Sequence, residues 1–170
     1  MQQVYIFAKR LYKPVTIIQI NTNIYSSPEI CFDLSRSVEL HKISTIHTNE
    51  SVVAGKATGL FEKGDTVKWR AKHFGIYQHL EMKITEMDFP VYFEDCMLKG
   101  IFKSITHKHY FKRNADHTIM TDEFMYKVPF GIAGEIFDGL FLKKYMTALL
   151  EKRNETIKQF AESERWKELF

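Results

Sequence analysis

A run of short alternating segments that ends in one long amphipathic helix constrains the fold of this chain most strongly. Between residues 66 and 128, apolar and polar side chains alternate in successive stretches separated by turn residues, which is typical of an antiparallel meander. Residues 137–160 then carry apolar side chains three and four positions apart, the spacing of one apolar helix face. Because an antiparallel sheet with one apolar face needs a cover, we expect the helix to lie across that face.

The segments before residue 66 complete the predicted fold. Ser27, Pro28 and Glu29 form a typical helix start, because serine can cap, proline fits the first turn and an acidic residue suits the positive helix end. Gly134 and Gly139 are expected to bracket a hinge before the long helix. Seven strands are expected, at Val15–Tyr25, Lys56–Phe61, Thr66–Phe74, Ile76–Met87, Val91–Leu98, Lys103–Lys112 and Thr118–Val128, and two short helices, at Pro28–Ser35 and Val38–Ile43. The sequence therefore predicts an α+β fold in which a curved antiparallel sheet of about seven strands wraps around a long C-terminal helix, with two short helices after the first strand.

Composition supports one folded unit and excludes several classes of protein. The chain of 170 residues is 45% hydrophobic and 14% aromatic, which is ample core material and excludes disorder. We find no internal repeat or linker, so we expect a single domain over residues 1–170 with its core at about 15–162. The net charge is only +3, and the basic residues do not gather into one block but include short pairs interleaved with acidic residues, whereas a nucleic-acid surface needs a continuous basic stripe. We therefore expect no nucleic-acid partner.

The remaining sequence signals predict a cytoplasmic protein without a cofactor. No segment approaches the roughly 20 apolar residues of a membrane span, and residues 1–14 lack the basic start and apolar run of a secretory signal. Cys31 and Cys96 are the two cysteines, too few for a disulfide framework, and we expect them to be free thiols. A phosphate-binding glycine loop, a G-x-S-x-G nucleophile turn and a C-x-x-C pair are all missing from the sequence.

Several segments resemble the SRPBCC superfamily, which contains START lipid-transfer domains, polyketide cyclases and Bet v 1-like proteins. They are Glu39–His41, Val53–Gly55, Gly64–Gly75, His107–Phe111, Thr121–Asp122 and Val128–Gly131. The W-x-A-x-H-F-G and H-x-H-x-F patterns within them are the most specific, and the resemblance extends from about residue 15 to residue 160. It is closest to bacterial SRPBCC proteins, some of which are loosely described as cell division inhibitors. The resemblance implies a helix-grip fold with a cavity for a hydrophobic ligand, and it does not imply one particular chemistry.

Strand alternation predicts which side chains line such a cavity. Residues of one parity in each strand share a face, and in three strands this face combines apolar residues with histidines or an aspartate. The predicted ligand-binding residues are Trp69, Ala71, His73, Leu80, Met82, Ile105, His107, His109, Phe111, Met120, Asp122 and Phe124 on the sheet, and Leu140, Phe141 and Tyr145 on the helix.

His107, His109 and Asp122 share otherwise apolar inward faces, and buried polar groups must be paired. Asp122 is therefore expected to accept hydrogen bonds from one of the histidines. Such a cluster can fix the register of the sheet, or anchor the carbonyl or hydroxyl of a ligand. It can also act in acid–base catalysis through these three residues. With a third histidine it has the ligand types of a zinc or iron site. We expect no metal, because relatives are not generally metalloproteins.

These observations favour binding or carriage of a small hydrophobic molecule, such as a lipid, a polyketide-like compound or an aromatic compound. The alternatives are an enzyme of cyclase or dehydratase type that uses His107, His109 and Asp122, and a protein-interaction module. Trp166 and Phe170, four residues apart, can dock on the sheet rim or on a second subunit, or belong to a frayed tail. A homodimer is therefore possible, and integral membrane association is not expected.

Overall fold

The computed structural model describes residues 15–163 and 165–169, so the predictions for residues 1–14 and for Phe170 lie outside it. The strands are β1 (Thr16–Ile24), β2 (Ser51–Gly55), β3 (Thr66–His73), β4 (Ile76–Asp88), β5 (Tyr92–Lys99), β6 (Ser104–Asn114) and β7 (His117–Lys127). The helices are α1 (Pro28–Ser35), α2 (Val38–Ser44), α3 (Gly131–Phe137) and α4 (Lys143–Glu162), with short 3₁₀ turns η1 (Ile46–Thr48) and η3 (Arg165–Glu168) and a π-helical turn η2 (Asp138–Leu142).

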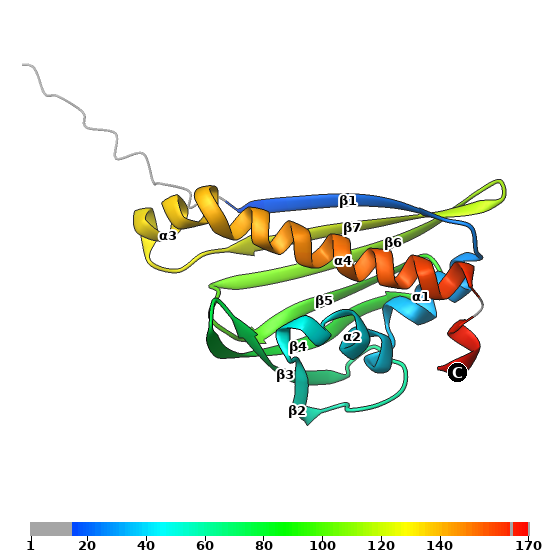
Figure 1. The fold of residues 1–170 in the computed structure, drawn as a ribbon, viewed down its shortest axis with the longest axis horizontal. Helices are drawn as coiled ribbons and strands as arrows, with labels where there is room; N and C mark the ends of the chain where they lie inside the picture. The colour runs from blue at the N-terminus through cyan, green and yellow to red at the C-terminus, as the bar shows by residue number, and fades with distance from the viewer. Residues whose placement is uncertain (1–14, 164, 170) are drawn as a thin grey trace, which may run out of the picture.

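In the described part of the chain, the strands form one antiparallel sheet in the order β1-β7-β6-β5-β4-β3-β2. β3 to β7 follow one another as hairpins, whereas β1 pairs with β7 at the opposite edge from β2. The chain crosses between these edges through α1 and α2, and α4 lies across the concave face of the sheet (Figure 1). The predicted curved sheet, long C-terminal helix and two short helices are confirmed. Within the described residues, no helix is long and apolar enough to cross a membrane.

The two short helices begin where their capping residues predict. The Ser27 hydroxyl accepts a hydrogen bond from the backbone N–H of Ile30 at 3.4 Å, and Pro28 occupies the first helical position. The Ser37 hydroxyl caps α2 in the same way, at 3.2 Å from the backbone nitrogen of Leu40. These bonds satisfy donors that a helix start otherwise leaves without partners.

Two hydrophobic clusters fill the space between the sheet and its helices. The first lies around Trp69 and Tyr126 and includes Leu142 and Leu150 of the C-terminal helical run. The second lies around Phe32 of α1 and includes the end of α4. Trp166 packs against this second cluster, which places the predicted docking of this residue on the chain itself.

The predicted second strand is wrong by several residues. β2 is Ser51–Gly55 rather than Lys56–Phe61, and it pairs with β3 from Ser51–Arg70 to Gly55–Val67. The β-branched pair in the middle of β2 favours a strand. The segment after it contains Gly59 at a φ of 76°, a left-handed conformation that interrupts a strand.

The predicted hinge is also wrong, because α3, η2 and α4 follow one another without a break from Gly131 to Glu162. Gly134 instead allows a close approach to the preceding loop. A Cβ at this position would lie 1.9 Å from the carbonyl oxygen of Pro129. The glycine is therefore required by packing rather than by flexibility.

Candidate functional site

A cavity of about 220 Å³ lies between the sheet and α4, with a wall that is mainly apolar. Its lining includes most of the predicted ligand-binding residues, namely Trp69, Ala71, His73, Leu80, Met82, Ile105, His107, His109, Phe124 and Tyr145. The helix contributes further apolar residues that the prediction omitted, namely Leu142, Met146, Leu149 and Leu150. The alternation of the strands thus identified most of the sheet side of the cavity.

Phe111 and Met120 face inward as predicted but lie outside the cavity wall. Both are buried in the second hydrophobic cluster, where the ring of Phe111 lies 5.3 Å from that of Phe32. α1 fills this end of the sheet, so inward-facing residues there become core. Strand parity gives the face of a residue but not its position along the concave groove.

Leu140 and Phe141, the predicted helix-side residues, are 65% and 58% exposed and point away from the cavity. Asp138 takes the inward position instead, where its carboxylate accepts hydrogen bonds from the hydroxyls of Tyr126 and Thr16, each at 2.5 Å. η2 is a π-helical turn, which holds one more residue than an α-helical turn. The extra residue rotates the side chains of this turn relative to those of a regular α-helix, so Leu140 and Phe141 do not face the cavity as predicted.

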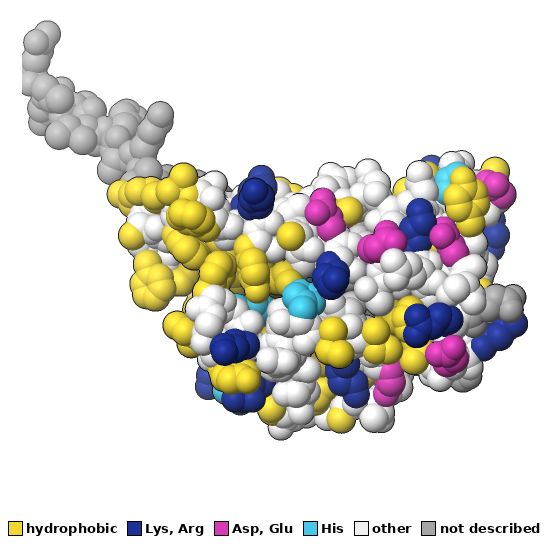
Figure 2. All heavy atoms as spheres, viewed as in Figure 1, with side chains coloured by type: hydrophobic (Ala, Val, Ile, Leu, Met, Phe, Trp, Pro, Cys, Tyr) yellow, Lys and Arg dark blue, Asp and Glu magenta, His cyan; other side chains and the backbone are white. Residues whose placement is uncertain are grey.

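The two displaced residues belong to an exposed apolar patch at the α3 end of the molecule. The patch consists of Phe130, Ile132, Ile136, Phe137, Leu140 and Phe141, which are 44–80% exposed. Figure 2 shows hydrophobic side chains gathered at this end of the face that α4 crosses. Exposed apolar patches of this kind are typical of interaction surfaces. The homodimer expected from Trp166 and Phe170 stays a prediction.

Asp122, which is fully buried behind the cavity wall, is the centre of a hydrogen-bonded polar cluster. Its Oδ1 lies 2.8 Å from Nε2 of His107, 2.9 Å from Nδ1 of His109 and 3.3 Å from Nη1 of Arg153. Its Oδ2 accepts a hydrogen bond from the side-chain amide of Asn154 at 2.6 Å. Asp122 therefore meets the expected histidines but does not line the cavity, which corrects its assignment as a ligand contact.

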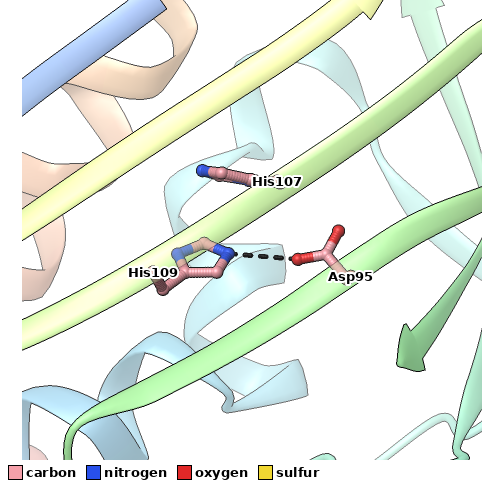
Figure 3. A group of neighbouring side chains, drawn as sticks. All are labelled: Asp95, His107 and His109. Atoms are coloured by element: carbon pink, nitrogen blue, oxygen red, sulfur yellow. Dashed lines mark hydrogen bonds and ion pairs between the residues drawn. The ribbon is translucent and has the colours of Figure 1, made fainter. Parts of the chain in front are cut away.

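Asp95 of β5 extends the cluster on the cavity side and was not among the predicted site residues. Its Oδ2 lies 3.0 Å from Nε2 of His109 (Figure 3). The β5–β6 register places Phe93 opposite His109 and Asp95 opposite His107. Asp95 shares its parity with the buried Phe93, so strand alternation carried the signal that identifies it.

The cluster holds its carboxylates ionised and one imidazole neutral. Burial alone raises the pKa of Asp122, but the hydrogen bond from His107 and the contacts with His109 and Arg153 hold that pKa well below its ordinary value. Burial also raises the pKa of Asp95, but the hydrogen bond from His109 and the nearby charges of His107, His109 and Arg153 together lower that pKa below its ordinary value. Burial and the neighbouring His109 lower the pKa of His107 to about 4, although Asp122 and Asp95 act in the opposite direction.

Acid is expected to destabilise the fold through His107. Between its ordinary pKa of 6.5 and its folded pKa of about 4, the unfolded chain binds a proton that the folded chain does not. The free energy of unfolding should therefore fall as pH drops through this window, by at most about 1.4 kcal/mol per pH unit from this residue. Urea unfolding at several pH values should give a shallower decline for His107→Gln than for the wild type. Equal slopes would contradict a buried neutral His107.

His73 lies elsewhere on the wall and is not part of the cluster. Its Nδ1 lies 2.8 Å from the hydroxyl oxygen of Tyr145, which links β3 to α4 across the cavity. Nearby, the His41 ring of α2 stacks on Trp69 with 4.2 Å between ring centroids. The third histidine that the metal hypothesis required is therefore not His73.

Comparison with solved structures identifies the fold. The chain superimposes on the di-domain ARO/CYC protein StfQ of the steffimycin biosynthetic pathway with a TM-score of 0.71 and 9% identity, covering 89% of this chain and 52% of StfQ. A START superfamily protein from Mycobacterium smegmatis gives a TM-score of 0.65 at 10% identity, covering 86% of this chain and 97% of that protein. The chain therefore shares with these proteins the helix-grip fold, a curved antiparallel sheet around a long C-terminal helix.

A third structure supports the same assignment. The protein TTHA0849 from Thermus thermophilus shares the fold with a TM-score of 0.66 and 17% identity, covering 84% of this chain and 97% of that protein. No protein-family model and no curated protein matches the sequence. The SRPBCC resemblance predicted from the sequence motifs is thus confirmed for the fold, which SRPBCC proteins use for different functions.

Proposed function

We propose that the chain binds a small molecule with an apolar body and one polar end group inside the cavity. The observation that carries this proposal is the composition of the cavity wall. Apolar side chains of β3, β4 and α4 form most of it, and Asp95, His107 and His109 gather at one place on it. An apolar pocket with a few convergent polar groups is the usual form of a small-molecule site.

The volume limits the class of ligand. The cavity of about 220 Å³ is smaller than the roughly 300–1,000 Å³ of sites for drug-sized ligands. This size favours an aromatic or polyketide-like molecule of one or two rings over a lipid with two acyl chains. The charged and neutral groups at the polar end, Asp95 and His107, favour a hydroxyl or carbonyl on the ligand over a carboxylate.

An enzyme of cyclase or dehydratase type is the alternative, because the polar cluster reaches the cavity. Acid–base catalysis works best with a group whose pKa lies near the operating pH. The low pKa of His107, about 4, makes it a weak base at neutral pH. This favours binding over catalysis by His107. Conversion of a poly-ketone or enone substrate by the wild type, and its loss in His109→Gln, would favour the enzyme instead.

Ala71→Leu tests the proposed site by filling it. Ala71 lies on the wall of the cavity and is buried, so the larger side chain takes volume from a ligand without removing a core contact. We expect affinity for 2-naphthol, a two-ring probe with one hydroxyl, to fall at least about tenfold, or 1.4 kcal/mol. Fluorescence titration measures the affinity of each protein for 2-naphthol. Lys72→Leu, at an exposed neighbouring position, is the matched control and should bind as the wild type does. Equal affinities for all three proteins would place the probe outside the cavity.

A further inference from the structure

We propose that Asp95, His107 and His109 bind one divalent transition-metal ion at the polar end of the cavity. Each of these residues offers one ligand atom, and the three atoms all lie within 4.8 Å of one another. Figure 3 shows His107 and His109 on one strand and Asp95 on its neighbour, with the carboxylate turned toward the histidines. Two imidazoles and one carboxylate form a donor set that zinc and ferrous iron commonly take.

The spacing fits one ion. Two donor atoms that each lie about 2.1 Å from an ion are separated by roughly 3.0–3.4 Å at octahedral or tetrahedral angles. Nε2 of His109 and Oδ2 of Asp95 are 3.0 Å apart. The backbone ladder places the third residue beside them, since Asp95 and His107 lie directly opposite each other in the β5–β6 register. The three ligand atoms lie within 4.8 Å of one another, so the wider separations would have to shorten when an ion binds.

The contacts of His109 give a second, independent indication. Carboxylate oxygens lie at both of its ring nitrogens, with Asp122 at 2.9 Å from Nδ1 and Asp95 at 3.0 Å from Nε2. Within the described residues, Nδ1 is buried and makes no aligned hydrogen bond. A neutral imidazole has one N–H, so it can donate to only one carboxylate, and its other nitrogen then faces oxygen lone pairs. A cation between Nε2 and Asp95 removes this conflict.

Asp122 provides the outer support that metal-binding histidines usually have. It contacts Nε2 of His107 and Nδ1 of His109, which leaves Nδ1 of His107 and Nε2 of His109 as donors. A carboxylate behind a ligating imidazole fixes its tautomer and raises its basicity. Asp122 would therefore orient His107 through a hydrogen bond and support His109 through its 2.9 Å contact with Nδ1, without touching the ion.

Charge and access also favour a cation. Among the described residues in the cluster, the carboxylates of Asp95 and Asp122 face a single guanidinium, that of Arg153. A divalent ion offsets the remaining negative charge in this buried environment. Asp95, His107 and His109 all line the cavity, so open coordination positions face its interior, where an oxygen of a ligand can bind. The ion site does not depend on the proposed ligand, because it can be measured in ligand-free protein.

Titration of the untagged, chelator-treated chain with Co²⁺ and Zn²⁺ tests the proposal. We expect one Co²⁺ per chain, with visible absorption bands that Zn²⁺ removes by competition. Asp95→Asn and His109→Gln preserve side-chain size and should weaken Zn²⁺ binding at least tenfold. Asp122→Asn should weaken it by about 10–100-fold through the outer support. His47→Gln, at an exposed histidine in η1, is the control and should bind as the wild type does.

Two results would overturn the metal site. One is wild-type protein that binds no Co²⁺ at micromolar concentration although its circular dichroism spectrum shows a folded chain. The other is binding that His47→Gln reduces and His109→Gln does not, which would show a surface site. Circular dichroism of each variant separates lost ligands from lost folding. Binding of 2-naphthol to the metal-free protein is measured separately, so failure of the metal site leaves the proposed function standing.

Discussion

Replacing Asp122 with Ala is expected to lower the free energy of unfolding by about 3–5 kcal/mol, the range for removing one partner of a buried charge pair. The substitution removes the acceptor for His107 and Asn154 and leaves the buried guanidinium of Arg153 without this carboxylate partner. Asp122→Asn should lower the free energy of unfolding less, because the amide oxygen still accepts hydrogen bonds. Urea unfolding followed by circular dichroism measures both changes.

Glu123→Ala is the matched control for Asp122→Ala. Glu123 is the next residue in β7 and faces the opposite side of the sheet, where its carboxylate lies 3.9 Å from Nζ of Lys108 and is partly exposed. Partly exposed ion pairs contribute little, typically about 0–1 kcal/mol. Similar losses for the two variants would contradict the buried cluster.

Trp69→Ala is expected to have the second large effect, on both stability and binding. The indole is buried on the cavity wall and stacks on the ring of His41. Truncation of a buried large aromatic side chain typically lowers the free energy of unfolding by about 3–5 kcal/mol. The affinity for 2-naphthol should fall as well, because the probe loses a wall of the cavity. Fluorescence titration should be carried out well below the lowered unfolding midpoint.

Lys68→Ala provides the comparison for Trp69→Ala. Lys68 neighbours Trp69 in β3, but its side chain has the opposite parity and faces away from the cavity. We expect a change within about 0.5 kcal/mol in stability and none in probe affinity. Equal losses for the two variants would mean that the facing assignment of β3 is wrong.

Much of the fold and the sheet side of the cavity could be predicted because the facing of antiparallel strands follows directly from the alternation of their residues. Alternation placed Trp69, His73 and His107 on the inward face, and the structure places all three on the cavity wall. The same rule could have found Asp95 through its parity with the buried Phe93. Arg153 and Asn154 could also have been identified from the sequence, because these two polar residues interrupt the apolar face of the long helix.

Other parts of the site depend on contacts that periodicity does not contain. Leu140 and Phe141 were assigned to the cavity on the assumption of one regular helix, whereas a π-helical turn and the buried carboxylate of Asp138 reset the phase. Phe111 and Met120 became core because α1 fills their end of the groove. A strand pattern gives no information on which helix will lie above a residue, so these assignments required the three-dimensional structure.

A crystal structure of the chain with bound 2-naphthol would show directly whether the ligand lies in the cavity. We expect the naphthalene rings between β3 and α4 beside Trp69, with the hydroxyl oxygen at the Asp95, His107 and His109 end of the cavity. Rings lying instead on the exposed apolar patch of Phe130 and Phe141, with the cavity unoccupied, would contradict this expectation.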